Sequence, residues 1–140
     1  MRLLDDRDGL MCGICNGFQA LIKLGLVPFG KIIDTDDTCP TLTFNTIGRH
    51  QSMLVRTRIA STGSPWLSKC EVGDEHTIAI SHGEGKFVAD EALLKRLSDN
   101  GQIAFQYADP ATGHATMQSP HNPNGSSWAI EGIILSLIHI

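Results

Sequence analysis

The sequence lacks the long apolar runs, basic clusters and repeats that mark several large classes of protein. None of its apolar stretches reaches the ~18 residues that a membrane-spanning helix needs. Its lysines and arginines are scattered, and the 140 residues carry a formal net charge of -4, which argues against nucleic-acid or anionic-membrane binding. The first ten residues place acids among apolar positions, unlike a secretory signal. We therefore expect a cytoplasmic protein without nucleic-acid or membrane partners.

The overall amino-acid composition is typical of a single globular domain. Hydrophobic residues make up 41% of the chain and charged residues 19%, a balance that neither disordered nor membrane proteins show. A chain of this length can bury one core without disulfides. The four cysteines are therefore expected to be reduced thiols: Cys12, Cys15, Cys39 and Cys70.

Strand and helix patterns are mixed along the chain. Residues 9–15 are predicted to form a short buried strand that turns sharply into a helix over residues 16–26. A second helix is predicted over residues 90–100, where Asp90 can cap a stripe of leucines. Further strands are expected at 41–45, 52–60, 75–81, 103–108 and within 128–138. Helices that directly follow strands indicate an α/β layered fold with some antiparallel hairpins.

The strongest candidate for chemistry is the motif Gly13-Ile14-Cys15-Asn16-Gly17, which has the form G-x-C-x-G at a strand-to-helix turn. This is the cysteine counterpart of the nucleophile elbow, in which glycines allow backbone and helix to approach closely. The helix N-terminus favours the thiolate form of Cys15. The N–H of Asn16 would point at an oxyanion forming on an attacked carbonyl. The alternative to a catalytic role is that Cys15 is simply a small apolar residue buried in the core.

Cys12 and Cys15 also form a C-x-x-C pair, which leaves a second class of function open. Such a pair occurs in redox modules and in halves of zinc sites. A closed zinc site needs two more ligands at suitable spacing, and neither Cys39 nor Cys70 has a partner two or three residues away. A redox or zinc-binding module is therefore the alternative outside the nucleophile class.

A glycine-bracketed loop, His82-Gly83-Glu84-Gly85, follows the strand expected at 75–81. Polar loops after buried strands often carry function. His82 and Glu84 could serve as base and orienting group for Cys15, or His82 could simply form hydrogen bonds within the loop. The loop does not fit a phosphate-binding motif, because Phe87 stands where serine or threonine is required.

Several segments in order resemble the glutaminase domain of phosphoribosylformylglycinamidine synthase, a class I glutamine amidotransferase. They are GICNGFQALIKLG, PTLTFNTIGRHQSMLVRTRI, ISHGEGKFVA, and NPNGS followed by WAIEGI. The resemblance implies a three-layer, flavodoxin-like α/β fold, incomplete at both ends. It covers residues 1–134 as a partial amidotransferase domain and leaves 135–140 as an atypical tail of possible foreign origin.

The resemblance also implies roles for individual residues. Cys15 matches the nucleophile that attacks the side-chain amide of glutamine, and the Asn16 N–H matches an oxyanion-hole donor. Gln19 matches the motif glutamine that helps to hold the substrate. His82, Gly83 and Glu84 match a loop that lines the glutamine pocket through backbone groups, and not the triad histidine and glutamate.

In the family that this chain resembles, the histidine and glutamate of the catalytic triad lie in a histidine-x-glutamate motif after the last strands. His139 does not match this motif, because only Ile140 follows it, so we do not assign it the role of the base. Because a missing base costs roughly 10²–10⁴-fold in rate, we expect the 140 residues alone to be a poor or inactive glutaminase and marginally folded. No metal site or cofactor is expected here. ATP and Mg²⁺ would belong to the synthase region that consumes the ammonia. A non-catalytic docking domain is the remaining alternative.

Overall fold

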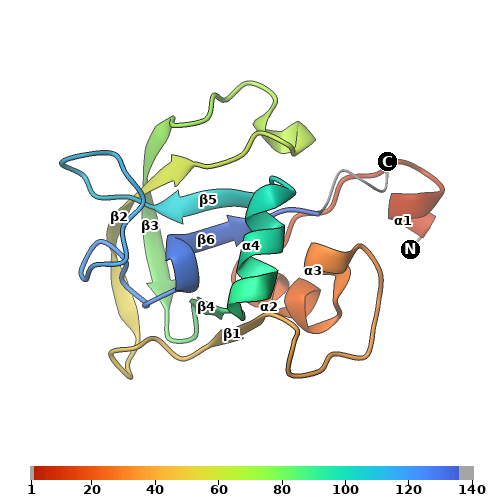
Figure 1. Ribbon diagram of the computed structural model, residues 1–140, viewed down its shortest axis with the longest axis horizontal. Helices are drawn as coiled ribbons and strands as arrows, with labels where there is room; N and C mark the ends of the chain where they lie inside the picture. Colours follow the sequence, from red (N-terminus) through yellow and green to blue (C-terminus); the bar gives the residue numbers. More distant parts are fainter. Residues whose placement is uncertain (1, 136–140) are drawn as a thin grey trace.

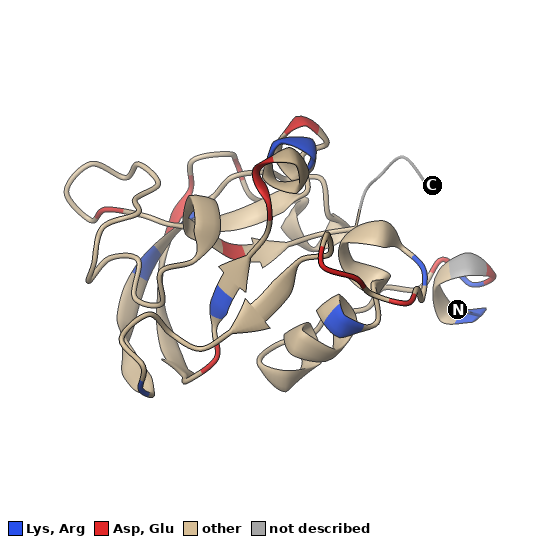
Figure 2. Cartoon of the chain, turned by 60° about the horizontal axis from the view of Figure 1, so that its bottom comes forward, with Lys and Arg blue, Asp and Glu red and all other residues tan. Residues whose placement is uncertain are grey.

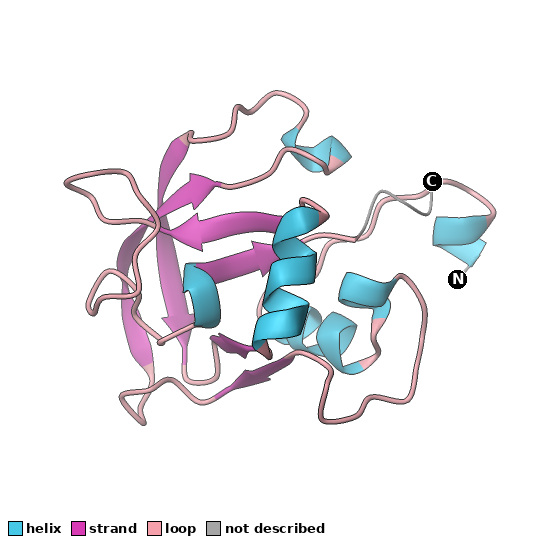
Figure 3. Ribbon diagram, viewed as in Figure 1, coloured by secondary structure: helices cyan, strands magenta, loops and turns pink. Residues whose placement is uncertain are grey.

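The computed structural model describes residues 2–135 as a mixture of short helices and antiparallel strands (Figures 1 and 3). The helices are α1 (Arg2–Asp5), α2 (Asn16–Lys23), α3 (Leu26–Phe29) and α4 (Glu91–Asp99), with 3₁₀ turns η1 (Pro65–Leu67) and η2 (Ser127–Ala129). The strands are β1 (Thr41–Thr43), β2 (Gln51–Ile59), β3 (Glu75–His82), β4 (Lys86–Val88), β5 (Ile103–Tyr107) and β6 (Ile130–Ile133). The expected tail at 135–140 and His139 lie almost entirely outside the described residues.

Two sheets organise the described part of the chain. The larger sheet has the strand order β3-β2-β5-β6, and a two-stranded sheet pairs β1 with β4. All of these pairings are antiparallel, so the parallel pairing typical of a flavodoxin-like sheet is not found among residues 2–135. The β2–β3 pair is the longest and brings Gln51 opposite His82. This register places the loop after β3 beside the segment that leads into β2.

Helix α4 supplies three of the seven buried residues of the main hydrophobic core, more than any other element. Its leucines lie on one face and pack with residues of α2, β4, β5 and β6 in a single cluster of Ile22, Phe87, Leu93, Leu94, Leu97, Ile103 and Ile130. Figure 1 shows α4 lying over β5 and β6 on one side of the larger sheet. The core therefore joins the N-terminal helices to the C-terminal strands.

The expected helices and most expected strands are confirmed. The Asp90 carboxylate accepts a hydrogen bond from the Leu93 N–H at 2.7 Å, as an N-cap should. Strand β2 alternates between exposed or partly buried positions and the buried Val55, Thr57 and Ile59. Asn122-Pro123-Asn124-Gly125, a sequence typical of turns, forms a turn with Gly125 at a φ of 79°.

The strand expected at residues 9–15 is wrong for this structure, because this segment is irregular. Its apolar side chains are exposed instead of buried, with Leu10, Met11 and Ile14 at 51%, 45% and 82% exposure. A strand exists only through hydrogen bonds to a neighbouring strand, and no strand of the described chain pairs with this segment. The sharp turn that was expected at its end is nevertheless formed.

Charged residues are spread over several elements, with basic and acidic positions interspersed (Figure 2). One exposed pair joins Lys95 to Asp99 across one turn of α4 at 2.7 Å. None of the helices between residues 2 and 135 has both the length and the apolar character needed to cross a bilayer.

Candidate active site

Cys15 occupies the turn that leads from the irregular segment 9–14 into α2. The backbone of Cys15 has a φ of 57° and a ψ of −117°, a combination that residues other than glycine rarely adopt. Trp128 also has a positive φ, but its ψ of 28° falls within the allowed left-handed helical region. Such backbone strain costs on the order of 1–3 kcal/mol and is concentrated at functional sites. A strained residue at a helix start is the geometry of a nucleophile elbow.

Gly13 makes this turn possible. A Cβ atom at Gly13 would lie 2.6 Å from the carbonyl carbon and oxygen of Gly17, which is closer than real Cβ contacts. The close approach expected for the first glycine of the motif is thus present. Gly17 differs, because an added Cβ there would meet no heavy atom within 4 Å.

The Cys15 thiol is exposed at the N-terminus of α2. Its Sγ lies 4.0 Å from Asn16 Oδ1. The N–H of Asn16 is the first of the helix and has no acceptor within it, so it is free in principle to donate to a ligand. Cys12 is also exposed and is not in a disulfide. The arrangement offers an accessible sulfur next to a helix N-terminus.

Gln19 connects this helix to the loop at residues 82–85. It lies one turn after Cys15, with its N–H donating to the Cys15 carbonyl at 3.1 Å. Its side-chain Nε2 donates to the carbonyl oxygen of Glu84 at 3.2 Å. Residues 65 positions apart in sequence are therefore joined directly. This bond brings the G-x-C-x-G turn and the glycine-bracketed loop into one candidate site.

His82 lies at the start of this loop, at the end of β3. Its Nδ1 is 3.1 Å from Asn45 Oδ1, and its Nε2 is buried without a hydrogen-bond partner among residues 2–135. Burial lowers the pKa of His82 below its ordinary value of 6.5, and the charge of nearby His50 lowers it further. The ring packs against Gly85, where a Cβ would lie 2.6 Å from His82 Nδ1.

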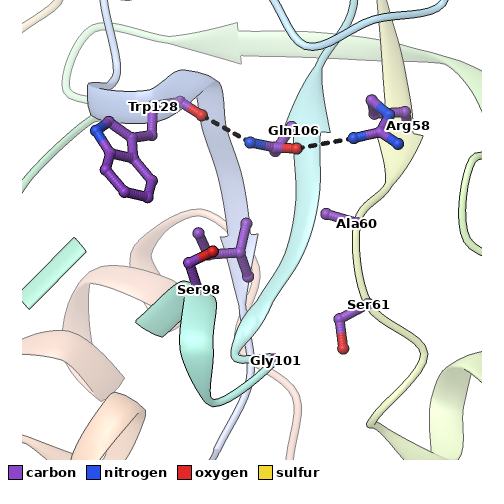
Figure 4. Close-up of a pocket in the computed structure, with 8 residues that line it drawn as sticks. Arg58, Ala60, Ser61, Ser98, Gly101, Gln106 and Trp128 are labelled. Carbon is purple, nitrogen blue, oxygen red and sulfur yellow. Dashed lines mark hydrogen bonds between the residues drawn. The ribbon is translucent and has the colours of Figure 1, made fainter. Parts of the chain in front are cut away.

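A separate hollow of about 160 Å³ lies between β2, β5 and the end of α4 (Figure 4). In it the Gln106 side chain lies between Arg58, which donates to its Oε1 at 3.1 Å, and the Trp128 carbonyl, which accepts from its Nε2 at 2.9 Å. None of the six site residues expected from the sequence lines this hollow. Within residues 2–135 there is no group of three or more histidine, cysteine or acidic side chains placed to hold a metal ion.

The comparison with protein families decides the class to which this site belongs. Residues 1–136 match the CobB/CobQ-like glutamine amidotransferase domain. The chain belongs to this family. Because the match includes the Cys15 turn and the loop at 82–85, both halves of the candidate site fall within the amidotransferase domain.

Several relatives of this amidotransferase domain share one name. The chain is 36% identical over 128 residues to phosphoribosylformylglycinamidine synthase subunit PurQ of Symbiobacterium thermophilum, covering 91% of this chain and 48% of the relative. It is 39% identical over 129 residues to the same subunit of Acaryochloris marina, covering 89% and 47%. The chain spans about half the length of the curated relatives that it matches.

A solved structure shows the same likeness in three dimensions. The structure of PurLQS from Thermotoga maritima aligns with a TM-score of 0.63 and 25% identity, covering 92% of this chain and 46% of that chain. Together with the mixture of helices and sheets, this match confirms the predicted α/β amidotransferase fold. The resemblance drawn from the sequence motifs is confirmed as well.

Sequence patterns did not identify the side chains that support the loop of this amidotransferase domain. Asn45 is 2% exposed, and both its Nδ2 and its Oδ1 form hydrogen bonds with the loop. Asn124 and Ser126, both fully buried, bond to the Gly85 carbonyl. The NPNGS segment can be recognised from the sequence as a turn, but the sequence does not show that this turn bonds to the loop at 82–85. A polar residue two positions after the short strand at 41–43 was the available signal for Asn45.

Proposed function

We propose that this chain carries the nucleophile and part of the substrate pocket of a glutaminase. The ammonia that this glutaminase releases would serve the amidation carried out by phosphoribosylformylglycinamidine synthase. Membership in the glutamine amidotransferase family supports the reaction class, and the names of the relatives support the synthase. The single observation that carries the proposal is the strained, exposed Cys15 at the start of α2.

In the proposed reaction the Cys15 thiolate attacks the side-chain amide carbon of glutamine. The negative charge that develops on the carbonyl oxygen accepts a hydrogen bond from the Asn16 N–H. The carbon–nitrogen bond then breaks, ammonia leaves with an added proton, and a thioester remains on Cys15. Water hydrolyses the thioester to glutamate and restores the thiol. The resemblance assigns the proton transfer to a histidine-x-glutamate motif that follows the family's last strands.

The bound glutamine would lie between α2 and the loop at residues 82–85. Gln19, His82, Gly83 and Glu84 are the residues proposed to line this pocket. The hydrogen bond from Gln19 Nε2 to the Glu84 carbonyl supports the assignment, because it holds the two segments side by side. The proposal includes a cytoplasmic location and a synthase partner, which would hold ATP and Mg²⁺.

The test is covalent labelling of the full chain by a glutamine-like diazoketone, followed by mass spectrometry of the modified peptide. We expect one adduct, on Cys15. Cys12→Ser should leave the labelling rate unchanged, and Cys15→Ser should abolish it. Iodoacetamide, which needs no glutamine pocket, serves as the control for thiol accessibility.

The same variants separate the proposal from a redox or zinc-binding pair. In that alternative, Cys12 and Cys15 act together, so either serine variant would remove a disulfide formed on oxidation or a bound metal. Equal loss of labelling in Cys12→Ser and Cys15→Ser would contradict the glutaminase proposal. Metal measured in the purified chain at one equivalent would do the same.

A further inference from the structure

The backbone carbonyls of the loop at residues 82–85 are all engaged by other segments. The His82 carbonyl accepts from Asn45 Nδ2 at 2.8 Å, and the Gly83 carbonyl accepts from the Asn45 N–H at 2.8 Å. The Glu84 carbonyl accepts from Gln19, and the Gly85 carbonyl accepts from Asn124 Nδ2 at 2.7 Å. A loop with every carbonyl bonded has a defined conformation.

The Asn45 side chain makes three hydrogen bonds to this loop, more than any other side chain in residues 2–135, and its bonds fix the orientation of its amide. Its Nδ2 donates to the carbonyls of His82 and, at 3.0 Å, of Arg49. Its Oδ1 accepts from the Gly85 N–H at 3.3 Å. A flipped amide would set its oxygen against two carbonyl oxygens and its NH₂ against an N–H, so the orientation is settled by the network.

The fixed amide in turn determines which nitrogen of His82 carries the proton. Asn45 Oδ1 can only accept, and it lies 3.1 Å from His82 Nδ1, so Nδ1 must be the protonated nitrogen. The neutral ring then has its lone pair on Nε2. That atom is buried and has no hydrogen-bond partner in the described chain. The ring is also held against Gly85, where no side chain would fit.

We infer that Asn45 is a positioning residue for the glutamine pocket, which acts by setting the backbone of residues 82–85 and the Nδ1–H tautomer of His82. This inference rests on the proposed function, because it treats the loop as part of that pocket. Asn45 acts through the loop and has no role in bond making. Its loss should weaken binding of a glutamine-like ligand and leave the reactivity of Cys15 unchanged.

The kinetic test measures labelling of the full chain by the diazoketone over a range of concentrations. Asn45→Ala should raise the half-saturating concentration by roughly tenfold, because part-buried groups of the loop lose their hydrogen-bond partners. The limiting labelling rate and the iodoacetamide rate should stay within about twofold of the unmodified chain. Asn100→Ala is the matched control, since Asn100 bonds to Gln102 and not to the loop; it should leave the half-saturating concentration unchanged.

A spectroscopic test follows the tautomer directly. The nitrogen chemical shifts of His82 should show the Nδ1–H form in the unmodified chain and a mixture of tautomers in Asn45→Ala. Asn45→Asp keeps the acceptor but loses both Nδ2 donors. It should therefore retain the Nδ1–H form while the half-saturating concentration still rises. This second variant also serves if Asn45→Ala does not fold, as judged by its thermal transition.

The outcomes separate this inference from the proposed function. Labelling of Cys15 with the same half-saturating concentration in Asn45→Ala and in the unmodified chain overturns the inference alone. An Nε2–H tautomer of His82 in the unmodified chain also overturns it. Failure of the diazoketone to label the unmodified chain, when iodoacetamide does, overturns the proposed function.

Discussion

The two halves of the candidate site are held in place by different means. The turn at Cys15 is shaped by neighbours in sequence, with the Gly17 N–H donating to the Ile14 carbonyl at 3.0 Å and Gly13 fitting under Gly17. The loop at 82–85 is shaped by bonds from residues 37 to 65 positions away. The turn is exposed, and the loop's supporting side chains are buried. A local motif thus presents the sulfur, while the tertiary structure shapes the pocket.

The sharpest way to break the local half is Gly13→Ala. The new methyl group would collide with the Gly17 backbone and move Cys15, so the diazoketone labelling rate should fall on the order of a hundredfold. The free energy of unfolding should also fall, by about 1–3 kcal/mol. Gly17→Ala is the matched control, because an added Cβ there is in open space. Equal labelling rates in the two variants would show that the turn does not depend on the close approach.

The long-range half is most vulnerable at Asn124, whose Nδ2 bonds to the Gly85 carbonyl and, at 3.1 Å, to the Tyr107 hydroxyl. Asn124→Ala removes the amide donor from the Tyr107 hydroxyl and leaves the Gly85 carbonyl with only the longer 3.5 Å bond from Ser126, so it should lower the free energy of unfolding by about 2 kcal/mol. Denaturant unfolding measures this change. Asn100→Ala, which removes one bond at a part-buried site, should cost about 1 kcal/mol or less. An equal loss in both variants would contradict the importance of the loop network.

The link between the two halves is the Gln19 side chain. Gln19→Ala removes its bond to the Glu84 carbonyl and should raise the half-saturating diazoketone concentration several-fold, roughly the value of one hydrogen bond. Stability should change by only about 0.5 kcal/mol. Lys23→Ala, one turn further along α2 and exposed, is the control. If both variants label like the unmodified chain, then the two segments do not form one pocket.

The smallest effect expected is a pH dependence carried by His82. Burial lowers the pKa of His82 in the folded chain below its ordinary value of 6.5. Once the pH falls below 6.5, His82 therefore binds a proton more readily in the unfolded chain than in the folded chain. Stability should therefore be unaffected by this residue above that value and should fall as the pH drops below it. The unfolding free energy of His82→Gln should show less of this acid loss than that of the unmodified chain. His76→Gln, at an exposed position, should keep the full loss.

The sequence correctly predicted those features that depend on residues only a few positions apart. Asp90 and the leucines of α4 predicted a capped amphipathic helix, and the two glycines around Cys15 predicted the turn, because caps, side-chain periodicity and glycine conformation act over one or two helical turns. The strand expected at 9–15 was wrong because a strand depends on a neighbour that its own pattern does not contain.

The amino-acid sequence by itself determined that Cys15 stands at a helix start and, through its motifs, the amidotransferase family. The exposure of the Cys15 thiol was decided by the tertiary structure, because the segment before it has no neighbouring strand within residues 2–135 to bury it. Only the tertiary structure decided what holds the loop at 82–85. Asn45 and Asn124 reach it across 37 and 39 positions of sequence, and no periodicity records such a pairing. The physical reason is that a buried amide needs partners for its donors and acceptor, and the fold alone determines which groups come close enough to provide them.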